Sequence, residues 1–258
     1  MNIVKKISFL LFTLAVLFAC KKESPIDTVA VNGALSGEFS VSKTKKVHFS
    51  QGNLKHPDNH TWSFATNQWE NGDLFEWSHH ANDSSFIDWG YYPITNGGDQ
   101  HNQWCTLTMN EWMYLFHGRA NAGYLFGFGK VNGVKGLIIL PDNGNGASDF
   151  HSALNKGFEW RYNEWIDRDS VVHRRYYYYT SKDDKYSHNT FKGKKWHEME
   201  LKGAVFLPVV DDCVSYWSAS RDLTSGPTDS YILDFYGHYL WPMASGPWYY
   251  RFSVRLVQ

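Results

Sequence analysis

The stretch "SYWSASRDLTSGPTDSYILDFYGHYLWPMASGPWYYRFSVRLVQ", residues 215–258, closes the chain and carries its most regular patterns. Three segments in it, "SYWSAS", "SYILDFY" and "FSVRLVQ", are rich in aromatic and β-branched residues and are predicted to be strands. In the last of them Ser253 and Arg255 alternate with apolar residues, so we predict these two on the outer face. The segment "HYLWPMASGPWYYR" holds Pro, Gly and Ser among its rings and is predicted to be a turn-rich loop. The face predicted to join the core consists of Trp217, Tyr231, Leu233, Phe235, Phe252, Val254 and Leu256.

Upstream of this stretch, the segment "TLTMNEWMYLFHGR" is predicted to be a helix. Thr108 and Glu111 have the spacing of a capping box, in which each side chain satisfies an unpaired amide of the first turn. Gly118 is suited to end the helix. The apolar face at helical spacing consists of Trp112, Leu115 and Phe116.

Turn residues separate several further strands. Asn132-Gly133 between two valines predicts a type I′ hairpin, and the apolar run 137–140 predicts a buried strand that Pro141 ends. The turn chemistry of "KHPDNH" predicts an earlier hairpin. Residues 150–166 show partly helical character, and "KKWHEMELKGAVFLPVV" predicts a short helix followed by a buried strand at 204–207.

The composition limits the class of protein. The chain has 258 residues, enough for one sizeable domain or two small ones. Its formal charge of −1 gives no long-range attraction to phosphate backbones, so nucleic acid is not an expected partner. Aromatic residues make up 17% of the chain, more than packing usually requires. Frequent Gly and few long apolar helical segments predict short strands and many loops.

The amino terminus has the pattern of an export signal. A basic start precedes the apolar run "ISFLLFTLAVLFA", so we predict a signal peptide over residues 1–19. The segment Leu17–Cys20 resembles the lipobox of bacterial lipoproteins, which implies acylation of Cys20 and anchoring to a membrane without a spanning helix. The alternative is a plain secretory signal with an incidental cysteine. Because Lys21 follows Cys20, the resemblance favours the outer membrane, on its periplasmic face or at the cell surface. Residues 20–36 are predicted to be a tether, and residues 37–258 the folded domain.

Several segments, in order, resemble one family. They are "DWGYYPITNGGDQHNQWCTLTMNEWMYLF", "VNGVKGLIILPDN", "GAVFLP", "YWSAS", "YILDF" and "SVRLV". They are similar to the C-type-lectin-like domains of bacterial surface lipoproteins, whose relatives include the Fibrobacter major-paralogous domain and the formylglycine-generating-enzyme fold. The resemblance implies an α+β domain of twisted, mostly antiparallel strands with one or two helices and long loops. The carboxyl-terminal region also resembles the ligand-binding region of lectin-fold proteins diversified by retroelements.

The chemistry known for this family finds little support in the residues. Calcium-dependent lectins use Glu-Pro-Asn or Gln-Pro-Asp and Trp-Asn-Asp tripeptides, and none of these occurs here. The related enzyme uses a reactive cysteine pair that binds copper, whereas Cys105 and Cys213 stand far apart in sequence. These two cysteines are expected to form a disulfide or to remain as buried thiols. We therefore predict no cofactor and no enzymatic activity.

One other group of residues has metal-ligating chemistry. The segment "WSHHANDSSFIDWG" offers possible zinc ligands, but adjacent histidines in a strand point to opposite faces, so a polar loop is the favoured interpretation. The residues concerned are His79, His80, Asp83 and Asp88.

The aromatic carboxyl-terminal region is predicted to bind a ligand. Tyr and Trp rings bring large contact area at low conformational entropy cost, and Arg, Asp and His supply hydrogen bonds. The alternative is that the rings only cover the end of a sheet. The predicted function is recognition of a protein or carbohydrate ligand; a structural subunit of a surface assembly and a formylglycine-generating-type enzyme are the alternatives. The predicted ligand-binding residues are Arg221, Asp222, Asp229, Ile232, Asp234, Tyr236, His238, Tyr239, Trp241, Trp248, Tyr249 and Tyr250.

Overall fold

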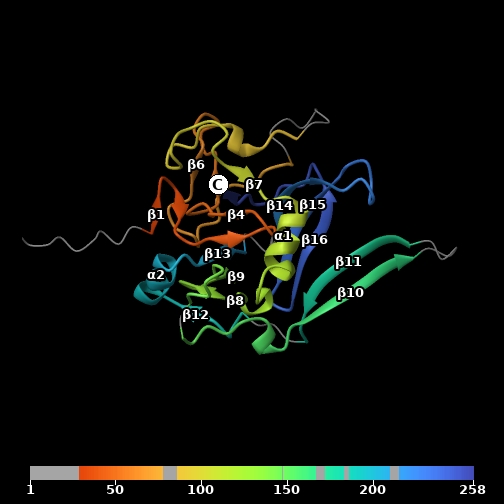
Figure 1. Ribbon diagram of the computed structural model, residues 1–258. Coiled ribbons are helices and arrows are strands. Elements are labelled where there is room, and N and C mark those ends of the chain that lie inside the picture. Colours follow the sequence, from red (N-terminus) through yellow and green to blue (C-terminus); the bar gives the residue numbers. More distant parts are fainter. Residues whose placement is uncertain (1–28, 78–85, 147, 167–171, 183–185, 210–214) are drawn as a thin grey trace, which may run out of the picture.

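The carboxyl-terminal stretch, residues 215–258, contributes three of the five strands of a large antiparallel sheet (Figure 1). The structure, a computed structural model, describes residues 29–77, 86–146, 148–166, 172–182, 186–209 and 215–258. Mostly antiparallel strands and two short α-helices confirm the predicted α+β class. The five strands of the sheet, in spatial order, are β10 (Glu159–Ile166), β11 (Val172–Thr180), β16 (Tyr239–Pro247), β15 (Asp229–Tyr236) and β14 (Ser215–Arg221).

Strand β16 replaces the turn-rich loop predicted for this segment, which was wrong for residues 239–247. It is the central strand of the sheet, between β11 and β15, and its side chains alternate strictly between buried and half-buried positions. The register with β15 shifts between the pairs Asp234↔Trp241 and Ile232↔Ala244, which gives β16 one extra residue at Pro242–Met243. A bulge is one of the few places where a sheet tolerates proline, because the missing amide is not needed there.

Strands β10 and β11 form a long hairpin that extends from the side of the molecule (Figure 1). The helical character predicted for residues 150–166 is limited to the 3₁₀ turn Leu154–Lys156, and residues 159–166 form strand β10. Among the described residues, the hairpin pairs with β16 at Tyr179↔Leu240 and Thr180↔Tyr239. Near this junction the ring of Trp160 stacks on His117 at 4.0 Å, which ties the hairpin to the body.

A second, four-stranded sheet lies beside helix α2 (Gly193–Leu201) (Figure 1). Asn132 and Gly133 join two of its strands with φ values of 50° and 93°, so the predicted hairpin is confirmed. The predicted buried strand before Pro141 is confirmed as well. Trp196 of α2 packs in the core of this sheet. The strands, in spatial order, are β12 (Thr190–Phe191), β8 (Phe126–Val131), β9 (Val134–Ile139) and β13 (Val205–Pro208).

Helix α1 (Met109–Met113) packs against the large sheet and begins as predicted. The Thr108 hydroxyl accepts a hydrogen bond from the Glu111 amide at 3.3 Å, and the Glu111 carboxylate accepts one from the Thr108 amide at 2.8 Å. A π-helical turn, Tyr114–Gly118, continues the helix to the predicted end. The predicted apolar face is fully buried: Trp112, Leu115 and Phe116.

The amino-terminal third contributes short strand pairs. Leu35 is buried in the main core and its amide bonds to the Phe49 carbonyl, so the folded part begins before the predicted boundary at residue 37. The β5–β6 pair confirms the hairpin predicted around "KHPDNH". The short strands are β1 (Ala30–Val31), β2 (Ala34–Leu35), β3 (Phe39–Ser40), β4 (Lys46–Val47), β5 (Leu54–Lys55), β6 (Ser63–Phe64), β7 (Cys105–Thr106) and β17 (Leu256–Val257).

The last seven residues, 252–258, lie between the short amino-terminal strands and the large sheet. Leu54 donates its amide to the Val254 carbonyl at 3.0 Å, and Trp217 donates to the Ser253 carbonyl at 3.0 Å. Only β17 is a regular strand in this segment, and it pairs with β7. Ser253 and Arg255 are each 1% exposed, so the prediction of an outer face for them was wrong. The segment is buried on both faces because chain packs against it from both sides.

Arg255 is held by a buried polar network. Its guanidinium donates to the amide oxygen of Gln68 at 2.8 Å and to that of Asn53 at 3.4 Å. Burial lowers the pKa of Arg255 to about 10, against the opposing influence of Tyr216 and Glu200. Gln68 also bonds to Glu200 at 3.2 Å, so the network links the last segment to α2.

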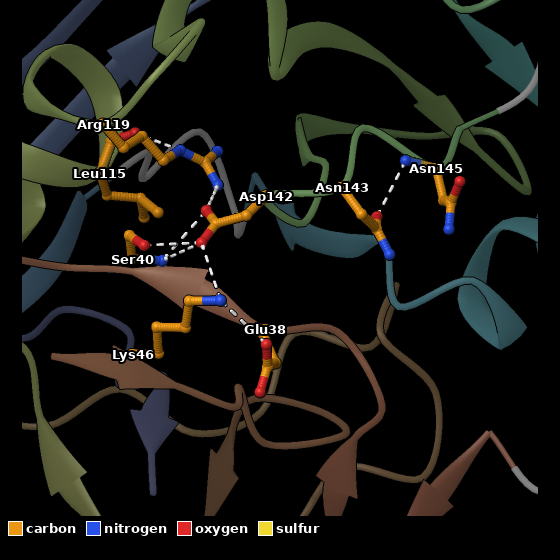
Figure 2. Close-up of polar contacts among 8 residues, drawn as sticks. All are labelled: Glu38, Ser40, Lys46, Leu115, Arg119, Asp142, Asn143 and Asn145. Atoms are coloured by element: carbon orange, nitrogen blue, oxygen red, sulfur yellow. Dashed lines mark hydrogen bonds and ion pairs between the residues drawn. The ribbon is translucent and has the colours of Figure 1, made fainter.

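A second buried arginine ties β3 to the chain that follows β9 (Figure 2). Arg119, nearly fully buried, donates from Nε to the Leu115 carbonyl at 2.8 Å and from Nη1 to Asp142 at 3.1 Å. The Asp142 carboxylate also accepts from the Ser40 hydroxyl at 2.6 Å and from its amide. Burial acts to raise the pKa of Asp142, but the bonds from Ser40 and Arg119 outweigh it and leave the pKa below its usual value.

Within the described residues, no helix has both the length and the apolar character needed to cross a membrane.

Candidate functional site

A hollow opens on the outer face of the large sheet where β10, β11 and β16 meet. Its volume is about 450 Å³. Tyr239 and Trp241 lie on the half-buried side of β16, and the turn between β15 and β16 contributes His238. The floor is therefore a regular sheet rather than a loop. The lining residues are Asn163, Tyr178, Thr180, His238, Tyr239 and Trp241.

A second hollow of about 600 Å³ adjoins the first and shares Tyr178 and Thr180 with it. Lys156, Arg161 and Lys182 also line it, and Arg161 is paired with Glu159 at 2.7 Å. We call the two hollows together the sheet groove. It combines aromatic rings at one end with charged and hydroxyl groups at the other.

The Tyr239 ring is fixed by the half-buried carboxylate of Asp234. Its hydroxyl donates to Asp234 Oδ2 at 2.7 Å, and the Ser215 hydroxyl donates to Asp234 Oδ1 at 2.9 Å. Burial raises the pKa of Asp234, and these hydrogen bonds offset the rise only in part. Burial and the neighbouring Asp234 also raise the pKa of Tyr239, so its phenol remains protonated. The ring can offer apolar surface to a ligand without losing its position.

The structure divides the predicted site residues into two groups. Strand β16 has nine residues and spans roughly 27 Å at about 3.4 Å per residue, so its two ends form separate surfaces. One group lies at the sheet groove or beside it: Asp234, Tyr236, His238, Tyr239 and Trp241. The other lies at the opposite end of β16: Arg221, Asp229, Trp248, Tyr249 and Tyr250.

Two predicted site residues are not on the surface. Asp222 is fully buried, and its Oδ1 accepts from the Thr224 hydroxyl at 2.6 Å and from its amide at 3.0 Å. It shapes the turn between β14 and β15. Ile232 lies on the face of β15 opposite to Leu233 and is 5% exposed, because a second core cluster that includes Trp217 covers this part of that face. Their predicted outward position was wrong.

Three residues that line the first hollow were not predicted: Asn163, Tyr178 and Thr180. They come from the β10–β11 hairpin, whose first strand was predicted to have partly helical character. The segments "EWRYNEWI" and "YYYYT" place every second residue on one face of an extended chain, and pairing of Arg161 with Tyr178 and of Glu159 with Thr180 brings those faces together. That period of two was the available signal.

Most of the histidines, aspartates and cysteines considered above as possible metal or thiol groups lie outside the described residues. His79, His80, Asp83, Cys20 and Cys213 lie outside the described residues. Asp88 has a structural role, since its carboxylate accepts from the Thr106 amide and hydroxyl, each at 2.8 Å. Cys105 is partly buried, and burial raises the pKa of its thiol. In the part of the chain that the structure describes, no three His, Cys, Asp or Glu side chains are grouped so that they could hold a metal ion.

Replacing Asp234 with asparagine is expected to stabilise the protein at neutral pH. The raised pKa means that the folded state disfavours the ionised carboxylate, so this cost is present above the folded pKa and disappears as the pH falls below the unfolded value. Asparagine can still accept from Tyr239 without the charge. Urea denaturation at neutral pH and at pH 3.5 measures the effect. A variant less stable than the wild type at neutral pH would contradict it.

Comparison of the chain with protein-family models, with curated proteins and with solved structures gives no match. The α+β class therefore rests on the structure itself, and the likeness to C-type-lectin-like lipoproteins stays a prediction from the sequence.

Proposed function

We propose that this protein is an exported, lipid-anchored binding protein of C-type-lectin-like architecture that recognises a glycan or protein ligand through the sheet groove. The observation that carries the proposal is the placement of Tyr239, Trp241 and Tyr178 around one hollow on a regular sheet. Acylation of Cys20 would hold it on the outer membrane, in keeping with the amino-terminal pattern.

The groove has the properties of a recognition surface. Aromatic rings with polar edges and few rotatable bonds provide contact area, while Asn163 and His238 supply hydrogen bonds. The sheet beneath is bonded on both sides, so little ordering is needed on binding. The concave shape suits a glycan chain better than a flat protein face.

Replacing Trp241 and Tyr178 with alanine is expected to weaken ligand binding. If each ring is an anchor, each truncation costs about 2 kcal/mol or more, roughly 30-fold in Kd. A glycan and protein array probed with the full-length protein identifies ligands, and calorimetry on the variants measures the loss. Tyr162→Ala is the matched control, because it removes an exposed Tyr from the same hairpin outside the lining of the groove.

The proposal fails if the double variant Trp241→Ala/Tyr178→Ala binds every array ligand as the wild type does. Equal losses in the control and in the groove variants would also contradict it, since they would indicate a change in the hairpin as a whole.

A further inference from the structure

Two hollows lie away from the sheet groove, around the turn that joins β5 to β6. One has a volume of about 450 Å³ and its neighbour about 420 Å³. Both are lined by His56, Asn59 and Trp62. The two hollows therefore share one rim, which we call the turn site.

A stack of aromatic rings forms the wall of the turn site. The ring of His56 lies on Trp62 with centroids 3.9 Å apart and planes 13° apart. Trp62 is in turn nearly parallel to Tyr92, with centroids 5.3 Å apart. Phe75 and Trp89 also line the larger hollow. Trp62 and Trp89 are buried, at 5% and 0% exposed, so the half-buried rings of His56, Phe75 and Tyr92 provide the apolar surface against which the C–H face of a sugar can pack.

Hydrogen bonds fix the turn in place without a ligand. The Asp58 carboxylate accepts from the amides of His60 at 3.0 Å and Thr61 at 2.6 Å, which lowers the pKa of Asp58 to about 2. The His56 amide donates to Asp73 at 2.5 Å. Asn59 has a φ of 56°, a left-handed conformation that asparagine tolerates. A preformed rim loses little entropy on binding.

Four other polar side chains at the turn site do not help to hold the turn in place. Glu76 and Arg251 line the larger hollow, Asp99 lines the smaller one, and Asn59 lines both. Among the described residues, none of these four side chains makes a hydrogen bond or an ion pair. Carboxylates accept, a guanidinium donates and an amide does both, which matches hydroxyl groups that also do both. The carboxylates of Asp73, Glu76 and Asp99 would repel an anionic ligand.

The exposed rings that follow β16, Tyr249 and Tyr250, lie beside the turn site because backbone hydrogen bonds join their segment to residues 75–77. The Phe75 amide donates to the Phe252 carbonyl at 2.9 Å, and the Trp77 amide donates to the Trp248 carbonyl at 2.9 Å. These bonds bring Arg251 to the larger hollow. Tyr249 and Tyr250, 52% and 50% exposed, are adjacent to Arg251 in sequence and provide further ring surface beside the rim.

We infer that the turn site binds a neutral sugar unit and is a glycan-binding site separate from the sheet groove. The inference depends on its own residues, and it holds whether or not the groove binds a ligand.

Calorimetry with the full-length protein tests this site. The probes are neutral hexasaccharides of glucose, mannose, galactose, xylose and N-acetylglucosamine. At least one is expected to bind, and Arg251→Ala/Glu76→Gln is expected to weaken that binding about tenfold or more, roughly 1.4 kcal/mol. Asn59→Gly keeps the left-handed turn but removes the amide, and it is expected to weaken binding as well. Tyr162→Ala, which removes an exposed ring outside both the turn site and the sheet groove, is the matched control and is expected to change Kd by less than about twofold.

Hydrogen exchange locates the bound sugar, and amides of residues 54–62 are expected to exchange more slowly in its presence. The inference is overturned if no hexasaccharide binds, or if binding survives both sets of turn-site changes. Binding that only Trp241→Ala abolishes would support the sheet groove and exclude the turn site.

Discussion

Replacing Asp142 with alanine is expected to lower the free energy of unfolding by about 3 kcal/mol, because the charge of Arg119 stays buried without its carboxylate partner. The side chain of Arg119 is only 1% exposed, whereas that of Asp142 is 24% exposed, so water can reach the guanidinium only through the space that Asp142 leaves. The Ser40 hydroxyl and amide lose their acceptor in the same change. Chemical denaturation at neutral pH measures the loss.

Because Asp142 is ionised in the folded state, its contribution to the free energy of unfolding is expected to depend on pH. The folded pKa of Asp142 lies below its usual value, so its contribution is present above the unfolded pKa and is lost as the pH falls through the folded one. The gap between Asp142→Ala and the wild type should therefore narrow in acid. The control is Glu38→Gln, which breaks the neighbouring exposed pair with Lys46 at 3.0 Å and should leave the denaturation midpoint unchanged. Equal effects of the two changes would refute the assignment.

Replacing Arg255 with alanine is expected to cost about 3–5 kcal/mol of unfolding free energy, as for other truncations of a large buried side chain. The change removes a donor from Gln68 and Asn53 and leaves a cavity between the short amino-terminal strands and the large sheet. Thermal and urea denaturation give the magnitude.

Arg255→Met separates the two causes. Methionine fills much of the volume but carries no charge, so this variant is expected to be at least about 2 kcal/mol more stable than Arg255→Ala. If the two variants were equally unstable, the hydrogen bonds would account for the whole effect and the cavity for none. An alanine variant as stable as the wild type would contradict the structural role given to the network.

Local signals predicted those elements that their own residues specify. The capping box of Thr108 and Glu111 and the Asn132-Gly133 turn each need only a few neighbouring residues, and both were confirmed. Strand β16 was missed because Pro242 and Gly246 indicate a loop when considered alone. The bulge that accommodates Pro242 depends on pairing with β15, and pairing between strands is a property of the tertiary fold.

The candidate site was predicted in part for the same reason. Tyr239 and Trp241 were identified by composition, but the partners that complete the hollow, Tyr178 and Asn163, come from a distant hairpin. The burial of Arg255 was unpredictable from alternation, because it requires chain packed on both faces of the last segment. Periodicity indicates which residues share a face, but it does not show which faces are covered.

The position of the first strand bears on how the protein would meet a bilayer. Strand β1 and the β10–β11 hairpin lie at opposite sides of the molecule (Figure 1). Cys20 precedes Ala30 by ten residues, a length that reaches at most about 35 Å when extended. If Cys20 is acylated as proposed, the folded domain stays within about 35 Å of the lipid headgroups, and the hairpin lies on the side of the molecule away from the anchored end.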